Sequence, residues 1–231
     1  MRCKLVLDLD NTLLCAMAVR FDRVVEPDFL MGQDAWAAVA HLDVEPRKRP
    51  LYFVYQRPGV VPFLKTLAAD GRFGLVLWTA GSVAYAHATL GGMGVLELFE
   101  EVLGFEQCTL RWKDKAGVFH QEDVEGRRRK ALKDLSVFDG AVSEGQALLM
   151  VDDKPDAILN GDGRVLTMPC FAGDPEDRKL DELLDVLLNG EPWDAVSLGA
   201  RLPGWAAHEP YAWTKERGVK LVQPSPEHLK G

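Results

Sequence analysis

Two aspartates, Asp8 and Asp10, interrupt the apolar stretch L-V-L-D-L-D-N-T-L-L at residues 5–14. Burying an unpaired carboxylate against a protein core costs several kcal/mol, so both acids need a partner that compensates their charge. Thr79 follows a second apolar run, and Asp152 and Asp153 follow a third. Acids and a hydroxyl at the ends of three separate apolar runs indicate one shared chemical site.

A divalent metal ion would compensate these charges. Oxygen ligands without a neighbouring histidine favour a hard cation, and Mg²⁺ commonly uses a few carboxylates while leaving positions for water and phosphate. A calcium loop is the competing interpretation of D-L-D-N-T, but Leu13 stands at its sharp-turn glycine position and Val19 at its bidentate glutamate position. With Mg²⁺ bound, one aspartate could attack phosphorus as a nucleophile and the second could transfer protons. A lysine would balance the negative charge of the phosphoryl group.

Buried strands and amphipathic helices alternate along the chain and would position these groups. Strand-like runs occupy residues 4–9, 51–55, 73–78, 147–151 and 165–168, and helical spacing occupies residues 34–42, 58–70, 82–92 and 175–188. Ser82 is placed to cap the third of these helices. This alternation predicts an α/β fold with a central, mostly parallel sheet covered by helices on both faces. Ligands of such sheets bind at the carboxyl ends of the strands, where the acids and Thr79 lie.

Residues 101–138 contain short, polar strand-like pieces, T-L-R-W and G-V-F-H, and we expect a small antiparallel β insertion there. Residues 1–190 would form the domain that contains this insertion. Residues 191–231, which have no clear period, would form a C-terminal extension that packs on the domain or is partly mobile.

The bulk properties exclude several classes of protein. The apolar content of 47% and the charged content of 27% are ordinary for a globular protein. A net charge of −8 argues against a broad nucleic-acid surface, and no segment reaches the roughly 18 apolar residues of a membrane span. The four cysteines contain no C-x-x-C pair, which favours a reducing compartment. Without a signal peptide, we expect a cytoplasmic or nuclear protein that binds neither membrane nor nucleic acid.

The segments D-L-D-N-T-L-L, L-W-T-A-G, K-D-L and V-D-D resemble, in order, the four motifs of the haloacid dehalogenase (HAD) superfamily phosphatases. Y-Q-R-P-G-V at residues 55–60, and G-V-F-H followed by K-A-L-K-D-L-S, resemble the branch of RNA polymerase II C-terminal-domain phosphatases and NLI-interacting-factor-like small phosphatases, which share the FCP homology domain. The resemblance covers roughly residues 3–188. It implies a HAD-like Rossmannoid fold and Mg²⁺-dependent, two-step phosphomonoester hydrolysis through an aspartyl-phosphate.

The resemblance also implies roles for the first two motifs. Asp8 corresponds to the nucleophile and an Mg²⁺ ligand, and Asp10 to the general acid/base, whose backbone carbonyl also binds the metal. Thr12 would steady the motif loop. Thr79 and the amide of Ala80 would bind the phosphoryl oxygens.

The last two motifs supply a cation and a metal ligand. Lys133, in the context K-D-L, corresponds to the family's lysine, although Lys130 lies three residues away and is the alternative. Asp153 corresponds to the metal ligand of the fourth motif, with Asp152 beside it as the other possibility.

The resemblance favours a phosphoserine or phosphothreonine protein as substrate. A small phosphate ester, and a non-catalytic phosphopeptide-binding or scaffold role, are the alternatives. Asn11 and the run V-D-D-K-P-D depart from the branch's more frequent glutamate and Asp-Asn. The run R-R-R-K at residues 127–130 is either a solvated basic face or an electrostatic guide for an acidic or phosphorylated substrate, and Trp112 is a further candidate to face the substrate.

Overall fold

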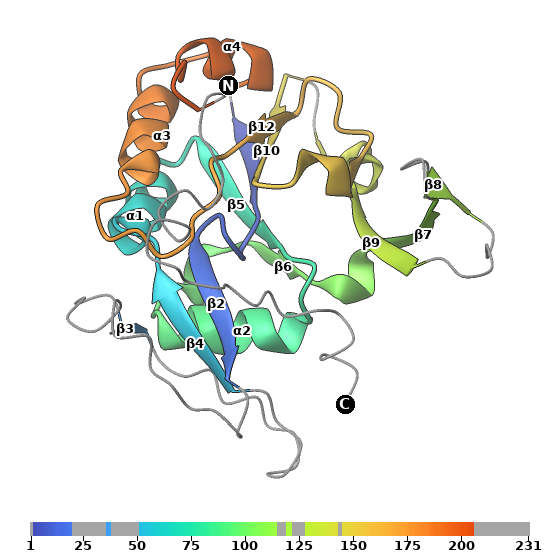
Figure 1. The fold of residues 1–231 in the computed structure, drawn as a ribbon. Coiled ribbons are helices and arrows are strands. Elements are labelled where there is room, and N and C mark those ends of the chain that lie inside the picture. Colours follow the sequence, from blue (N-terminus) through green and yellow to red (C-terminus); the bar gives the residue numbers. More distant parts are fainter. Residues whose placement is uncertain are drawn as a thin grey trace.

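The computed structural model describes residues 2–19, 36–37, 51–114, 119–121, 128–142 and 145–205 of the 231-residue chain. A parallel sheet of five strands, in the order β12-β10-β1-β5-β6, lies at the centre of this part (Figure 1). In chain order its strands are β1 (Cys3–Leu7), β5 (Phe73–Trp78), β6 (Glu101–Leu103), β10 (Ala147–Asp152) and β12 (Val165–Thr167). The parallel α/β architecture predicted from the sequence is confirmed.

The sequence predicts four of these strands to within two residues at each end, but it places residues 101–103 in the insertion. In the structure these three residues form β6, which pairs with β5 at the edge of the central sheet. β6 is short and only Leu103 is buried, so its apolar signal is weak. The insertion therefore begins after this strand.

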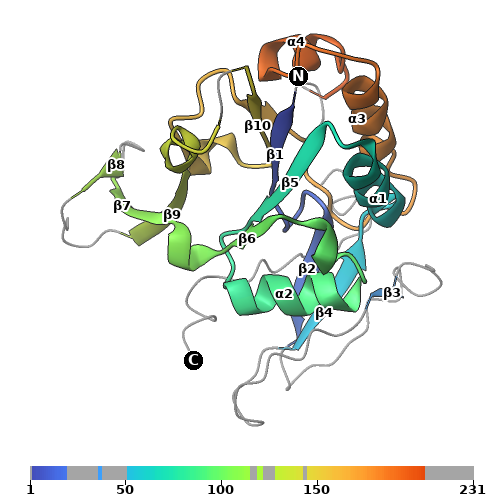
Figure 2. The same ribbon diagram turned by 180° about the vertical axis from the view of Figure 1, so that it is seen from behind.

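Both faces of the central sheet are buried. Successive strand residues point to opposite faces, so Leu5 packs in one apolar cluster and Val6 in another. The first cluster includes the buried sides of α1 (Val60–Asp70) and α3 (Lys179–Leu188), which lie side by side in both views (Figures 1 and 2). The second cluster is closed by the 3₁₀ helix η4 (Leu135–Phe138).

Local chemistry sets the helix ends. Glycines in the left-handed conformation, Gly59 at φ 79° and Gly71 at φ 72°, flank α1. The predicted cap of α2 (Val83–Gly92) is confirmed, because the Ser82 hydroxyl accepts a hydrogen bond from the Tyr85 backbone amide at 3.2 Å. The described part also contains the 3₁₀ helices η2 (Leu96–Leu98), η3 (Phe105–Gln107) and η5 (Pro155–Ala157).

α3 begins four residues later than the sequence predicts. Residues 175–176 form a turn, beside which the Asp174 carboxylate accepts the Glu176 amide at 2.9 Å. The Asp177 carboxylate accepts the Lys179 amide, also at 2.9 Å. These aspartates satisfy the backbone donors in a turn, so the helix starts only at Lys179.

A three-stranded antiparallel sheet follows β1 in the sequence, with the order β2-β4-β3. It contains β2 (Leu14–Val19), β3 (Trp36–Ala37) and β4 (Leu51–Gln56), the last being the predicted strand at residues 51–55. The helix predicted at residues 34–42 is wrong where it can be compared, because Trp36–Ala37 pair with β4 as a strand. Pairing across the sheet overrides the helical tendency of the alanines. The other residues of that prediction lie outside the described part.

The predicted antiparallel insertion is present as β7 (Thr109–Lys113), β8 (Phe119–His120) and β9 (Arg128–Asp134). It extends away from the central sheet in both views (Figures 1 and 2). A two-residue strand, β11 (Ile158–Leu159), pairs parallel with β9. The insertion is thus joined to the segment that follows β10.

The chain beyond residue 190 packs on the domain as far as the structure describes it. Trp193 stacks 5.0 Å from the Phe73 ring and donates its indole N–H to the Leu187 carbonyl at 3.1 Å. α4 (Ala195–Ala200) and Trp205 belong to the same apolar cluster as α1 and α3. The division of the chain at residue 190 stays a prediction. In the part of the chain described, no helix has the length and apolarity needed to cross a membrane.

Candidate active site

The register of the central sheet brings the ends of three strands to the same level. Leu7 of β1 pairs with both Leu77 of β5 and Val151 of β10. The Asp8 amide donates to the Val151 carbonyl at 3.0 Å, which continues the β1–β10 pairing by one residue. Asp8 and Asp152 therefore emerge side by side, and Thr79 emerges from the neighbouring strand.

Lys133 is the cation of this edge. Its ammonium group donates to Asp8 Oδ1 at 2.5 Å and to Asp152 Oδ2 at 2.6 Å, and its side chain is only 4% exposed. Burial lowers the pKa of Lys133, but the charges of Asp152 and Asp8 outweigh burial and raise it, so the ammonium stays charged. Lys130, the alternative, is exposed. It lies three residues from Lys133 on β9 and is therefore on the opposite face of the strand.

Asp8, Asp152 and Asp153 can each place a carboxylate oxygen within 4.8 Å of the others. Burial, followed by the charge of Asp8, raises the pKa of Asp153 to about 7. Burial also raises the pKa of Asp152 to about 6, although Lys133 opposes this rise. Three buried carboxylates around one buried ammonium leave excess negative charge, and an all-oxygen donor set of this size fits a hard divalent cation.

Asp152 and Asp153 differ in their partners. Asp152 Oδ2 faces the Lys133 ammonium, and Asp152 Oδ1 accepts the backbone amide of Lys154 at 2.7 Å. The Asp153 carboxylate, whose side chain is also buried, has the Lys154 ammonium at 3.9 Å. Asp152 thus has a donor on each oxygen, whereas Asp153 has a more distant cation.

Asp10 is held by two hydroxyl groups. Tyr85 donates to Asp10 Oδ1 at 2.7 Å, and Thr79 donates to Asp10 Oδ2 at 3.2 Å. Burial raises the pKa of Asp10, and the two hydrogen bonds only partly oppose that rise. The protonated form is favoured relative to a solvent-exposed aspartate, as a proton donor requires.

Tyr85 is a site residue that sequence reasoning missed. It is buried on α2 four residues before the buried Thr89, and an aromatic residue at that spacing indicates core packing. A Cβ atom on Gly81 would approach the Tyr85 ring to 2.9 Å, so the glycine of T-A-G makes room for this side chain. No pattern in the sequence distinguishes Tyr85 from an ordinary core residue of this helix.

Thr79 and Ala80 form a tight loop after β5. The Thr79 hydroxyl accepts the Gly81 amide at 3.0 Å while donating to Asp10. Thr79 is buried, and Ala80 is exposed at the tip of the loop. The hydrogen bonds of Thr79 therefore fix the buried part of the loop, whereas Ala80 is exposed to solvent.

The loop of the first motif needs a left-handed residue, and Asn11 supplies it at φ 66°. The Asn11 amide donates to the Leu14 carbonyl, and the Asn11 carbonyl accepts the Phe171 amide, both at 2.6 Å. The buried Thr12 hydroxyl has no hydrogen-bond partner among the described residues. Its backbone carbonyl, however, accepts Arg57 Nη1 at 2.9 Å. Thr12 is held through its backbone.

Arg57 joins three segments beneath the site and is fully buried. Its guanidinium makes a bidentate pair with Asp177 at 2.8 and 2.9 Å. It also donates to the carbonyls of Thr12 and Pro169, each at 2.9 Å. The planar guanidinium suits such a fork, and the arginine of Y-Q-R-P-G-V thus anchors the first motif loop.

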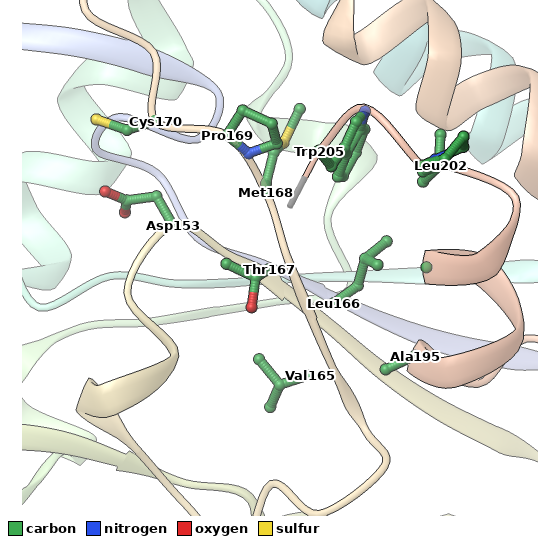
Figure 3. Close-up of a pocket in the computed structure, with 12 residues that line it drawn as sticks. Asp153, Val165, Leu166, Thr167, Met168, Pro169, Cys170, Ala195, Leu202 and Trp205 are labelled. Carbon is green, nitrogen blue, oxygen red and sulfur yellow. The ribbon is translucent and has the colours of Figure 1, made fainter. Parts of the chain in front are cut away.

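A pocket of about 410 Å³ opens beside the carboxylate cluster (Figure 3). Asp153 and Cys170 lie at one end, and Leu202 and Trp205 lie at the other. Among the acids and the lysine described above, Asp153 alone is part of its lining. The pocket is adjacent to the edge that carries Asp8 and does not enclose it.

The fold is similar to that of two solved structures. One is the structure of Fcp1, an essential RNA polymerase II CTD phosphatase, at 16% sequence identity and a TM-score of 0.50, with 98% of this chain and 56% of that chain covered. The other is a fission yeast Fcp1 variant bound to beryllium fluoride, at 16% identity and a TM-score of 0.48, with 98% and 59% covered. The chain thus spans less than two thirds of either protein, and the likeness to the first shows a shared HAD-like fold.

The sequence itself identifies the family. A comparison with curated proteins gives no match. The profile of the NLI interacting factor-like phosphatases, however, matches residues 3–195, which is most of the chain and includes the clustered aspartates, Thr79 and Lys133. The chain belongs to the NLI interacting factor-like phosphatase family.

Proposed function

We propose that the protein is an Mg²⁺-dependent phosphomonoester hydrolase that acts through an aspartyl-phosphate, with phosphoserine or phosphothreonine proteins as its substrates. The observation that carries the proposal is the separation of two aspartates by their partners. Asp8 faces a charged ammonium, whereas Asp10, two residues on, faces two hydroxyl groups. The ammonium beside Asp8 suits a carboxylate nucleophile, and the burial that raises the pKa of Asp10 suits an acid, which are the two roles that this catalysis requires.

The first chemical step transfers the phosphoryl group to Asp8. An ionised oxygen of Asp8 attacks phosphorus, and the bond between phosphorus and the ester oxygen breaks. Asp10 gives its proton to the departing oxygen, so the product is a neutral alcohol. Thr79, the Ala80 amide and the Lys133 ammonium are the proposed donors to the phosphoryl oxygens.

The second step returns the enzyme to its starting state. Asp10, now ionised, takes a proton from a water molecule, and the water oxygen attacks the phosphorus of the aspartyl-phosphate. The acyl-phosphate bond breaks, inorganic phosphate leaves, and Asp8 is again a carboxylate. The Tyr85 hydroxyl, which donates to Asp10 Oδ1, holds Asp10 in one orientation for both proton transfers while the Thr79 hydroxyl donates to the phosphoryl group.

Asp8, Asp153 and the backbone carbonyl of Asp10 are the proposed ligands of Mg²⁺. Asp153 is preferred to Asp152 because both oxygens of Asp152 already accept hydrogen bonds from Lys133 and the Lys154 amide. When bound, Mg²⁺ would neutralise charge on the carboxylates and the phosphoryl oxygens. The excess of buried carboxylates over buried ammonium supports this assignment.

The preference for phosphoproteins rests on the family and on the similarity to Fcp1, which is a phosphatase of the RNA polymerase II CTD. A protein substrate would also contact the insertion. Lys133 at the site belongs to β9, and the same strand carries exposed residues farther from the site. A small phosphate ester would contact only the inner end of that strand.

Hydrolysis of para-nitrophenyl phosphate tests the proposed activity. We expect release of para-nitrophenol with Mg²⁺ and a loss of at least about 100-fold when EDTA removes the metal, because charge stabilisation in such sites contributes several kcal/mol. Restoring Mg²⁺ should restore the rate. Undiminished hydrolysis in EDTA, or none by folded protein with Mg²⁺, would contradict the proposal.

Replacing Tyr85 with Phe should impair proton donation by Asp10 while leaving the aromatic packing intact. We expect kcat/KM for phenyl phosphate, whose leaving oxygen is basic, to fall roughly tenfold, since one hydrogen bond to a charged group is lost. With para-nitrophenyl phosphate, which needs less protonation, kcat/KM should fall less than about threefold. An equal loss for both esters would show that Tyr85 acts only through packing.

A further inference from the structure

One face of the insertion points toward the candidate active site. Alternate residues of a strand lie on the same face, so Arg129 and Ala131 share the face from which Lys133 reaches Asp8. Across the antiparallel pair, Leu110 is the partner of Ala131 and Trp112 is the partner of Arg129. We call these four residues, Leu110, Trp112, Arg129 and Ala131, the insertion face.

The insertion face presents both apolar and cationic groups to solvent. Leu110 is an exposed large apolar side chain, at 37%. The Arg129 guanidinium lies 4.9 Å from the centre of the Trp112 ring, and Arg129 is exposed. Stacking on a ring uses the flat side of a guanidinium and leaves its N–H groups at the edge, where they suit a carboxylate or phosphate.

The spacing along β9 fixes how far this cation lies from the chemistry. Arg129 and Lys133 are separated by four residues, which is about 13 Å in a strand at roughly 3.3 Å per residue. An extended peptide rises by nearly the same amount per residue. A peptide with its phosphorylated residue at Lys133 would therefore pass Arg129 about four residues away.

We propose that Arg129, which lies over the Trp112 ring on the insertion face, takes an anionic side chain about four residues from the phosphate of a protein substrate. Charge complementarity favours this occupant, because Arg129 is an exposed cation on the insertion face of a chain whose net charge is −8. The inference rests on the proposed phosphatase function and adds a sequence preference to it.

A scan with phosphoserine peptides tests this spacing. In one series, a single Glu is moved through about six positions on either side of the phosphoserine in an otherwise uncharged peptide, and kcat/KM is measured for each. We expect a maximum about four residues away on one side, about threefold to tenfold above the peptide without Glu, as a charge-assisted contact at an exposed site gives. A profile without a maximum would overturn the proposal.

Two variants of neighbouring residues separate a placed contact from general attraction. Arg129→Gln should remove the maximum and leave para-nitrophenyl phosphate hydrolysis unchanged. Lys130→Gln, which removes the same charge from the opposite face of the same strand, should keep it. Arg129→Glu should move the preference to a Lys at the same peptide position. Equal effects at positions 129 and 130 would contradict the insertion face as the binding surface.

Binding to a variant without the nucleophile distinguishes failure of this inference from failure of the proposed function. The affinities of the same peptides for Asp8→Asn protein, measured by fluorescence anisotropy, do not depend on turnover. A position-dependent affinity without hydrolysis by the parent would contradict the phosphatase and support the insertion face. Hydrolysis by the parent with no position dependence in rate or affinity would overturn only the insertion face.

Discussion

Asp8→Asn protein is expected to fold normally and to lose at least about 10⁴-fold in the rate of para-nitrophenyl phosphate hydrolysis, because an amide cannot form the covalent intermediate. The side chain keeps its volume, and an amide oxygen can still accept a hydrogen bond from Lys133, which retains its pairing with Asp152. Phosphate release and circular dichroism together measure the two effects. Asp156→Asn, at an exposed carboxylate nearby on η5, is the matched control and should keep full activity.

The neighbouring change Asp10→Asn should have a different kinetic signature. It removes the proton donor and acceptor, so we expect turnover to fall about 10²- to 10⁴-fold. Mg²⁺ binding should largely persist, because the Asp10 backbone carbonyl is unchanged, and titration calorimetry would measure it. Complete loss of Mg²⁺ binding would contradict the role proposed for Asp10. Turnover by Asp8→Asn within tenfold of the parent would contradict the aspartyl-phosphate itself.

Arg57→Met is expected to cause the largest loss of stability, about 3–5 kcal/mol in the free energy of unfolding. Removing one partner of a buried ion pair leaves the other charge buried without compensation. Arg57 is fully buried, and its partner Asp177 is nearly so. For a domain of this size we expect the midpoint of thermal unfolding to fall by roughly 6–20 °C.

Two further variants make this prediction specific. Arg178→Met removes an exposed arginine whose pair with Asp181 lies at 3.3 Å, and it should cost less than about 1 kcal/mol. Arg57→Met combined with Asp177→Leu should recover part of the lost stability, because no unpaired charge then remains. Equal midpoints for Arg57→Met and Arg178→Met would show that the buried pair contributes nothing.

The features that the sequence predicts well are those set by short-range patterns. Residues 73–78 form a strand with the predicted ends, because both faces of the sheet are covered and every position is therefore selected for burial. The same pattern places Asp8 and Asp152 at neighbouring strand ends, since parallel strands end at a common edge. The Ser82 cap depends on a bond three residues away and is likewise local.

The features that the sequence does not predict depend on contacts between distant residues. Arg57 and Asp177 are separated by 120 positions, and nothing local distinguishes Asp177 from the other acids of its polar turn. Tyr85 fits the apolar spacing of α2 as well as any core residue does, although its hydroxyl reaches Asp10. β11 is two residues long and exists only because β9 lies beside it.

The position of Lys133 has a consequence for exchanging parts between members of the family. This residue belongs to β9, a strand of the insertion, yet its ammonium group is bonded to two aspartates at the ends of central-sheet strands. A chimera that receives another member's insertion therefore also receives that member's lysine. The position of its ammonium group relative to Asp8 and Asp152 is then set by the new strand. A graft intended to change the peptide preference should therefore replace only the β9 residues that lie farther from the site than Lys133. The lysine of this chain then stays in place.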